Sequence, residues 1–284
     1  MLTSTHAWNM DYEPTAEFGT GRQPRFRLLG NLEVWSADRQ TEIRGTIQRT
    51  LLATLLAAGS RTVSVQSLVD ELWAENPPAT AENSLQAHVS RLRRKLHSVG
   101  DRQPLGLLSL PSGYRLLVTD VDVDALLFMQ TVQEARRHAA VDPHAAVDRI
   151  RQALGAWRGP VFGGPMGGSI CQAAAASLEA ARTVALETLF DLELHHGRHS
   201  EVIPELSALV ESPSLNERIC EQLMVALYRS GRQTEALSAF RRMRVRLDDE
   251  LGVSPSPSLR KFETAILNHD PALHYGGDHL SLRS

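Results

Sequence analysis

The chain has 284 residues, of which 42% are hydrophobic and 22% charged, a composition typical of soluble globular proteins and sufficient for two compact domains. It has no apolar run near the roughly 20 residues of a membrane span and no secretory signal pattern, which excludes a membrane protein. It has only two cysteines, Cys171 and Cys220, which excludes a disulfide framework and predicts a cytoplasmic protein. Residues 22–118 hold 13 basic and 8 acidic residues, whereas the chain beyond 118 holds 17 basic and 22 acidic, so only the first part suits an anionic partner.

The first part of the chain begins with a polar segment, residues 1–21, which we expect to be a disordered tail. Short strands that form a small N-terminal β-sheet are then predicted at residues 25–29, 32–35 and 41–44. A helix is predicted over residues 48–58. A second helix should begin after Ser64, a suitable N-cap, and run to Trp73.

A basic amphipathic helix is predicted over residues 83–96, which read NSLQAHVSRLRRKL. One apolar stripe recurs at helical spacing, formed by Leu85, Val89, Leu92 and Leu96. The opposite face carries short polar and basic residues, with two more at its edges: Asn83, Ala87, Ser90, Arg91, Arg94, and at the edges Gln86 and Arg93. Residues 107–118, LLSLPSGYRLLV, predict two strands joined by a turn. This order is typical of a winged-helix DNA-binding domain, and a solvated charge run is the alternative.

Arg91 is the residue that we expect to read a base. It projects away from the apolar stripe, and its planar guanidinium can donate two hydrogen bonds to one guanine. The alternative for Arg91 is a solvated or phosphate-binding side chain. Contacts with phosphates, which fix position without conveying sequence information, are expected from Asn83, Ser90, Arg93 and Arg94.

Three further residues are candidates for DNA contact. Gln86 reads adenine or is an exposed polar residue without a role. Trp73 lies against the DNA backbone or belongs to the core. Arg115 is the cation of the predicted hairpin.

Beyond residue 118 the pattern is almost wholly helical. Helices are predicted at residues 123–140, 143–157, 171–195, 200–210, 215–230, 234–251 and 257–268. GRHSEV from Gly197 matches GRQTEA from Gly231 at an offset of 34 residues, and Ala236 and Phe240 form an A-x-x-x-F pattern. This period is typical of tetratricopeptide repeats, which stack into a surface for partner proteins. Coincidence between two unrelated helical hairpins is the alternative.

No segment of the sequence predicts catalysis. His195, His196 and His199 lie across a predicted helix end and do not share a face, so no metal site is expected. The glycine-rich segment 159–168 lacks the lysine of a phosphate-binding loop and predicts an irregular connection. We therefore expect no enzyme, no cofactor and no metal ion, with only the glycines favouring a cryptic enzyme.

Seven segments together carry a resemblance to a known family: FRLLGNLEVW, QRTLLATLLAAG, VSVQSLVDELWAENPPATAENSLQAHVSRLRRKL, PSGYRL, QALGAWRGP, LYRSGRQTEALSAFRRMR and DDELGVSPSPSLRKFETAIL. From about Arg25 to Pro271 the chain resembles the SARP family (Streptomyces antibiotic regulatory proteins). The resemblance implies a mainly α fold with a small β component. An OmpR-type winged helix-turn-helix domain with an N-terminal β-sheet and a wing hairpin is expected at 22–119. An all-α, tetratricopeptide-like bacterial transcriptional activation domain is expected at 120–270, with tails at 1–21 and 271–284.

For function, the resemblance implies a sequence-specific transcriptional activator of an antibiotic biosynthetic gene cluster. As a homodimer or as tandem protomers it would bind direct repeats of double-stranded DNA in the major groove. It would recruit RNA polymerase holoenzyme, including its sigma factor, within the nucleoid. The wing departs from the family pattern, because Ser109 and Leu110 occupy a stretch that often carries a basic residue. A tetratricopeptide-type interaction scaffold, or a ligand-responsive repressor with the same DNA contacts, is the alternative.

Overall fold

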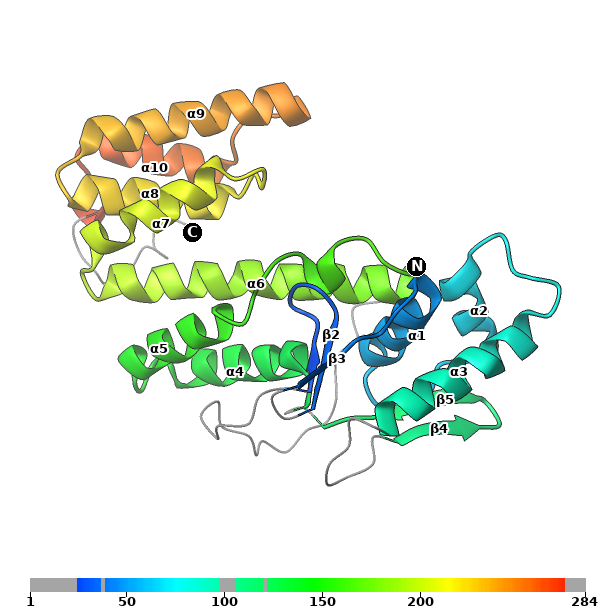
Figure 1. The fold of residues 1–284 in the computed structure, drawn as a ribbon. Helices are drawn as coiled ribbons and strands as arrows, with labels where there is room; N and C mark the ends of the chain where they lie inside the picture. Colours follow the sequence, from blue (N-terminus) through cyan, green and yellow to red (C-terminus); the bar gives the residue numbers. More distant parts are fainter. Residues whose placement is uncertain (1–24, 37–38, 98–105, 120–121, 274–284) are drawn as a thin grey trace. The chain divides into compact units, whose positions relative to one another are not determined.

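The computed structural model describes residues 25–36, 39–97, 106–119 and 122–273, and it is mainly helical with two small antiparallel sheets, as predicted (Figure 1). The described residues form two compact units. Unit 1 comprises the residues up to Arg137 together with Asp148–Thr183. Unit 2 comprises His138–Val147 together with the residues from Val184 onward. Within the described ranges, no helix combines the length and apolar character needed to cross a membrane.

The N-terminal sheet of unit 1 consists of β1 (Phe26–Arg27), β2 (Glu33–Ser36) and β3 (Arg39–Thr41), in the order β1-β2-β3. The first strand is shorter than the predicted 25–29, because the N–H groups of Leu28 and Leu29 donate to the carboxylate of Asp124 instead of to a strand. The predicted strand at 41–44 was wrong, since the third strand ends at Thr41. Extending its register with β2 by one pair would set Glu42 opposite Glu33, and like charges facing each other are unfavourable.

Three helices and a hairpin complete the winged helix-turn-helix in unit 1: α1 (Thr46–Ala57), α2 (Val65–Trp73), α3 (Ala81–His97), β4 (Gly106–Leu110) and β5 (Gly113–Leu117). The predicted N-cap of α2 is confirmed, because the Ser64 hydroxyl accepts from the Ser67 N–H at 3.0 Å. Val63 exchanges two backbone hydrogen bonds with Tyr114, at 2.8 and 2.9 Å. A Cβ at Gly113 would overlap the Val63 carbonyl oxygen, so this close approach requires glycine in the Pro-Ser-Gly-Tyr turn.

The helical part of the chain continues with α4 (Asp124–His138), α5 (Pro143–Leu154), the short turn η2 (Val161–Gly163) and α6 (Ser169–His195). The residues between α5 and α6, which include the whole glycine-rich segment 159–168, form an irregular connection as predicted. The predicted end of α5 at 157 was wrong, because the α-helix stops at Leu154 and Gly155 follows.

Unit 2 is built on the helices α7 (His199–Glu211), α8 (Glu217–Arg229), α9 (Gln233–Leu251) and α10 (Pro257–Leu267), with a final turn η3 (Pro271–Leu273). The 34-residue repeat is confirmed by the two turns. Gly197 and Gly231 both adopt positive φ, 76° and 75°. The N–H of Arg198 donates to the Glu193 carbonyl, and the N–H of Arg232 donates to the Leu227 carbonyl, at 3.1 and 2.8 Å. Equivalent bonds at equal spacing make α6–α7 and α8–α9 two copies of one hairpin.

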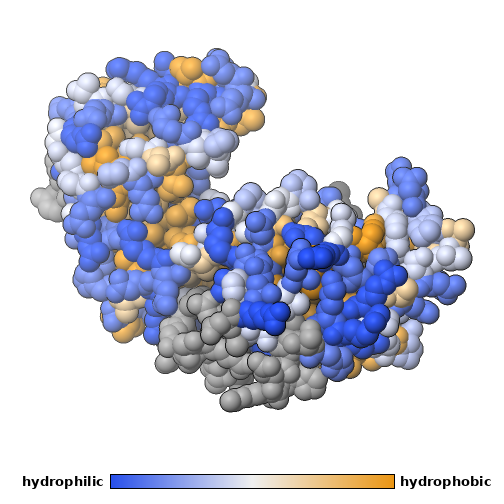
Figure 2. Space-filling model, viewed as in Figure 1, coloured by the Kyte–Doolittle hydropathy of each residue, from blue (hydrophilic) through white to orange (hydrophobic). Residues whose placement is uncertain are grey.

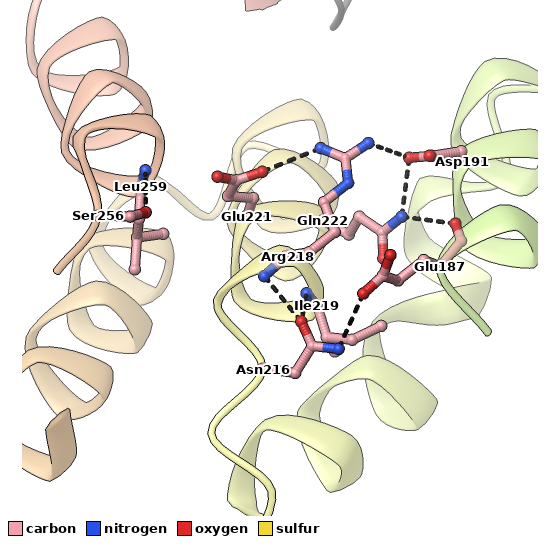
Figure 3. A network of polar contacts seen from close by, with 9 residues as sticks. All are labelled: Glu187, Asp191, Asn216, Arg218, Ile219, Glu221, Gln222, Ser256 and Leu259. Carbon is pink, nitrogen blue, oxygen red and sulfur yellow. Dashed lines mark hydrogen bonds and ion pairs between the residues drawn. The ribbon is translucent and has the colours of Figure 1, made fainter. Parts of the chain in front are cut away.

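A partly buried polar network joins the first helices of these two hairpins (Figure 3). Arg218 of α8 forms ion pairs with Asp191 of α6 at 2.6 Å and with Glu221 at 3.0 Å. The Gln222 amide donates to the Glu187 carbonyl and to the Asp191 carboxylate, both at 2.7 Å. Because Glu221 and Gln222 are buried, these partners are needed to offset their loss of hydration and they fix the register of α6 and α8.

Candidate DNA-binding surface

The helix α3 is held in unit 1 by its apolar stripe. Leu85, Val89, Leu92 and Leu96 are all at most 2% exposed and pack in the core that α3 shares with α1 and α2. Four such side chains supply several kcal/mol by burial, on the order of 1.5–3 kcal/mol each. The stripe therefore determines which face of α3 points to solvent.

The solvent face of α3 brings together five of the predicted DNA-contact residues, all of them exposed: Asn83, Gln86, Ser90, Arg91 and Arg94. Figure 2 shows hydrophilic side chains gathered over α3. Within the described ranges, Arg91 and Arg94 form no hydrogen bond or ion pair. Their guanidinium groups are accordingly available for an anionic partner, and the short side chain of Ser90 beside them leaves room for a close approach.

Arg93, also predicted to contact phosphate, is hydrogen-bonded to the hairpin. Its Nε and Nη2 donate to the Leu107 carbonyl oxygen at 3.0 and 2.9 Å, and Nη2 also donates to the Ser109 hydroxyl at 3.0 Å. Both acceptors belong to β4, so this guanidinium ties the wing to α3. Sequence reasoning missed this role because nothing local links positions that lie 14 and 16 residues apart.

Arg115 of β5 has a similar internal arrangement. Its Nε and Nη2 donate to the Thr62 hydroxyl oxygen at 3.0 and 2.8 Å, next to the Val63–Tyr114 bridge. The predicted cation of the wing is thus half-buried and fastened to the segment before α2. The wing also exposes two apolar side chains, Leu108 and Leu117.

Trp73 is half-buried at the end of α2, with its ring edge-on to that of His88 on α3, 6.3 Å between centroids. His88 is fixed from α1, because the Gln48 amide lies 2.9 Å from its Nδ1 and donates to its carbonyl oxygen at 3.1 Å. Burial lowers the pKa of His88, and the charge of Arg91 lowers it further. Folding therefore favours neutral His88, whose Nδ1 accepts from the Gln48 amide.

We expect unit 1 to lose stability as the pH falls below about 6.5, the usual histidine pKa. Because the pKa of His88 is lowered by folding, its contribution is present above the unfolded-state pKa and is lost as the pH falls through the folded-state value. The unfolding temperature of the wild type should drop more between pH 7.5 and 5.5 than that of His88→Gln, which does not titrate. Parallel pH profiles for the two proteins would contradict this assignment.

A buried carboxylate that sequence reasoning missed ties α4 to the N-terminal sheet. Asp124 accepts from the N–H groups of Leu28 at 2.6 Å and Leu29 at 3.3 Å, and forms an ion pair with Arg158 at 3.0 Å. Arg158 also pairs with Glu33 of β2 at 3.0 Å. Burial raises the pKa of Asp124, and the two N–H groups and Arg158 oppose that rise. Unit 1 therefore extends past residue 119, where the DNA-binding domain was predicted to end.

The histidines around the end of α6 form a small cluster in unit 2. The rings of His144 and His196 are stacked with centroids 4.2 Å apart, and that of His195 is edge-on to His196 at 6.0 Å. Burial lowers the pKa of His196, and the neighbouring His144, His195 and Arg198 lower it further. In the parts of the chain that the structure describes, no three His, Cys, Asp or Glu side chains are grouped so that they could hold a metal ion.

Comparison with known proteins identifies both halves of the chain. A family described as "Bacterial transcriptional activator domain" matches residues 123–267, and one described as "Transcriptional regulatory protein, C terminal" matches residues 40–116. Transcriptional regulator RedD of Streptomyces coelicolor is 38% identical over 93% of this chain and 75% of its own length. Regulatory protein DnrI of Streptomyces peucetius is 35% identical over 81% of this chain and 86% of its own length.

Two further relatives are longer than the part that matches. Regulatory protein AfsR of Streptomyces coelicolor is 38% identical over 88% of this chain, which spans only 25% of AfsR. The structure of Mycobacterium tuberculosis EmbR in complex with a low-affinity phosphopeptide superposes with a TM-score of 0.79 at 32% identity, covering 88% of this chain and 67% of that one. These relatives are transcriptional regulators, and the chain belongs to the SARP family of bacterial transcriptional regulators, with an OmpR-type winged-helix domain followed by a bacterial transcriptional activator domain.

Proposed function

We propose that this protein is a sequence-specific activator of a secondary-metabolite (antibiotic) biosynthetic gene cluster, and that it reads DNA with the solvent face of α3. The observation that carries the proposal is that α3 buries its whole apolar stripe while Arg91 and Arg94 remain exposed and form no hydrogen bond with any other residue that the structure describes. A helix of this kind fits the major groove. Membership of a family of antibiotic regulators supports the class of target.

Within this surface we assign different work to different residues. Arg91 reads a base and Gln86 contacts an adenine, while Asn83, Ser90 and Arg94 contact phosphates. Arg93 and Arg115 act mainly by holding the wing, since Nε and Nη2 of Arg93 donate to β4 and those of Arg115 donate to Thr62. Trp73, half-buried with its ring edge-on to His88 of α3, supports that helix and contacts the DNA backbone.

The division between Arg91 and Arg94 is tested with a duplex selected from a random library by the wild-type protein. Arg91→Ala should cost about 1–3 kcal/mol on this duplex and relax the preference at one base pair. Arg94→Ala should weaken selected and random DNA alike and reduce the salt slope by about one. Arg260→Ala, an exposed arginine of α10, is the control. Equal losses for both variants on both duplexes would remove the assignment.

For activation we propose that tandem protomers or a homodimer bind direct repeats near a promoter and that unit 2 contacts RNA polymerase holoenzyme, including its sigma factor. The repeated hairpins of unit 2 support this, because tetratricopeptide-like surfaces bind proteins. Such a protein acts at the nucleoid, in the cytoplasm. In transcription assays with purified components, an activator raises the amount of transcript made from the selected site and a ligand-responsive repressor lowers it. An interaction scaffold shows no binding preference for that site.

A further inference from the structure

A buried glutamate of the helix-turn-helix caps a helix of the activator domain, within unit 1. The Glu71 side chain leaves α2 and accepts from the backbone N–H groups of Gly168 at 2.8 Å, Ile170 at 2.6 Å and Cys171 at 3.4 Å. These groups belong to the first turn of α6 and the residue before it. Such N–H groups have no hydrogen-bond acceptor within their own helix. An acidic side chain accepts hydrogen bonds from them, and its negative charge is stabilised by the positive end of the helix dipole.

The glycine-rich segment is shaped around this carboxylate. A Cβ at Gly168 would lie 2.9 Å from Glu71 Oε1, and a Cβ at Gly167 would lie 2.9 Å from Oε2 and 2.8 Å from the Cys171 sulfur. Gly167 also adopts a positive φ of 66°. The two glycines are therefore explained by the need to admit Glu71, and no phosphate or other ligand is needed to account for them.

The contact between Glu71 and α6 affects the position of α3 through α2. Every residue of the turn 74–80 between α2 and α3 is exposed, so the turn itself contributes no buried contact that sets the angle between the helices. α2 is held instead by its own packing on α1 and α3 and by Glu71, only 6% exposed. Cys171 adds a contact from α6 to Thr54 of α1, with 3.4 Å between sulfur and hydroxyl oxygen.

We propose that Glu71 is a positioning residue for DNA recognition: by capping α6 it fixes the α2–α3 pair in the orientation in which α3 reads base edges. The proposal rests on the proposed DNA-binding function. It implies that residues 22–118 alone, which lack the α6 partner, hold α3 less accurately. Loss of the cap should therefore reduce discrimination between sequences, whereas attraction of the exposed arginines to any DNA remains.

The test compares the full-length wild type with Glu71→Ala and Asp70→Ala. Asp70 is an exposed neighbour on the same helix, so both variants remove one negative charge. For Glu71→Ala we expect the ratio of affinities for the selected duplex and for random DNA to fall about tenfold, as after loss of one good base contact. Affinity for random DNA should equal that of Asp70→Ala, which keeps its ratio. Amide exchange at Ile170 and Cys171 should accelerate only in Glu71→Ala.

A double-mutant cycle separates positioning from general loss of stability. Gly168→Ala should reduce the same ratio in the wild-type background, because its Cβ displaces the Glu71 carboxylate, and should add little in Glu71→Ala, where that carboxylate is gone. Additive effects would overturn the proposal, as would an unchanged ratio in Glu71→Ala or parallel losses on both duplexes. If the wild type itself prefers no DNA sequence, the proposed function is wrong, and so is the proposed role of Glu71 in DNA recognition. The amide exchange rates at Ile170 and Cys171 would still show whether Glu71 caps α6.

Discussion

Replacing Asp124 with alanine should destabilise unit 1 by about 3–5 kcal/mol, because two buried N–H groups lose their acceptor at about 1–3 kcal/mol each and one ion pair is lost with them. The Asp124 side chain is only 6% exposed, and the N–H groups that it accepts from belong to fully buried Leu28 and Leu29. Without the carboxylate these donors lose their partner, while Arg158 keeps Glu33. The loss should be measured as the change in free energy of unfolding in urea.

Two variants sharpen this measurement. Asp124→Asn retains one acceptor for Leu28 but places an amide against Leu29 and Arg158, so we expect a smaller loss of about 1–3 kcal/mol. Asp148→Ala removes an exposed carboxylate from α5 and should change stability by no more than about 0.5 kcal/mol. A loss below about 1 kcal/mol for Asp124→Ala would show that the contact between α4 and the N-terminal sheet contributes little, and that the DNA-binding domain ends where the sequence predicted.

The parts of the molecule that sequence reasoning recovered are those governed by local periodicity. The stripe from Leu85 to Leu96 repeats at the helical period and therefore predicted both the buried and the exposed face of α3. The match between Gly197 and Gly231 predicted two equivalent turns, because each requires a positive φ that glycine readily adopts. These signals depend on neighbouring residues only.

The parts that were missed depend on residues far apart in the chain. Glu71 and Asp124 each bind backbone N–H groups more than 90 residues away, and no spacing rule relates an acidic side chain to such a donor. The sequence offered only weak signals of these contacts: Glu71 stands directly before the apolar Leu72, and Asp124 stands directly before the apolar run 125–128. The hydrogen bonds of Arg93 with β4 were missed for the same reason, since the position of Arg93 on the helix gives no information about the wing that packs beside it.

Phe240→Ala should loosen unit 2 and abolish activation without changing DNA recognition. Phe240 is 2% exposed and belongs to the hydrophobic core of unit 2, which also includes residues of α7, α8 and α10. Emptying such a position costs about 3–5 kcal/mol, a large fraction of the stability of a domain this size. Differential scanning calorimetry should show a lower unfolding temperature for unit 2 alone, because Phe240 lies in unit 2. DNA affinity should be unchanged, because every predicted DNA-contact residue belongs to unit 1.

The matched control for Phe240→Ala is Val245→Ala on the same helix, α9, where the side chain is 52% exposed and its truncation should change stability by no more than about 0.5 kcal/mol. In transcription with purified polymerase holoenzyme, Phe240→Ala should occupy the selected duplex with wild-type affinity but fail to raise the transcript, whereas Val245→Ala should activate normally. Undiminished activation by Phe240→Ala under conditions where unit 2 is unfolded would move the polymerase contact to unit 1. The repeats of unit 2 would then act as a scaffold or a sensor. Loss of DNA affinity in the same variant would instead show that DNA binding by α3 requires a folded unit 2.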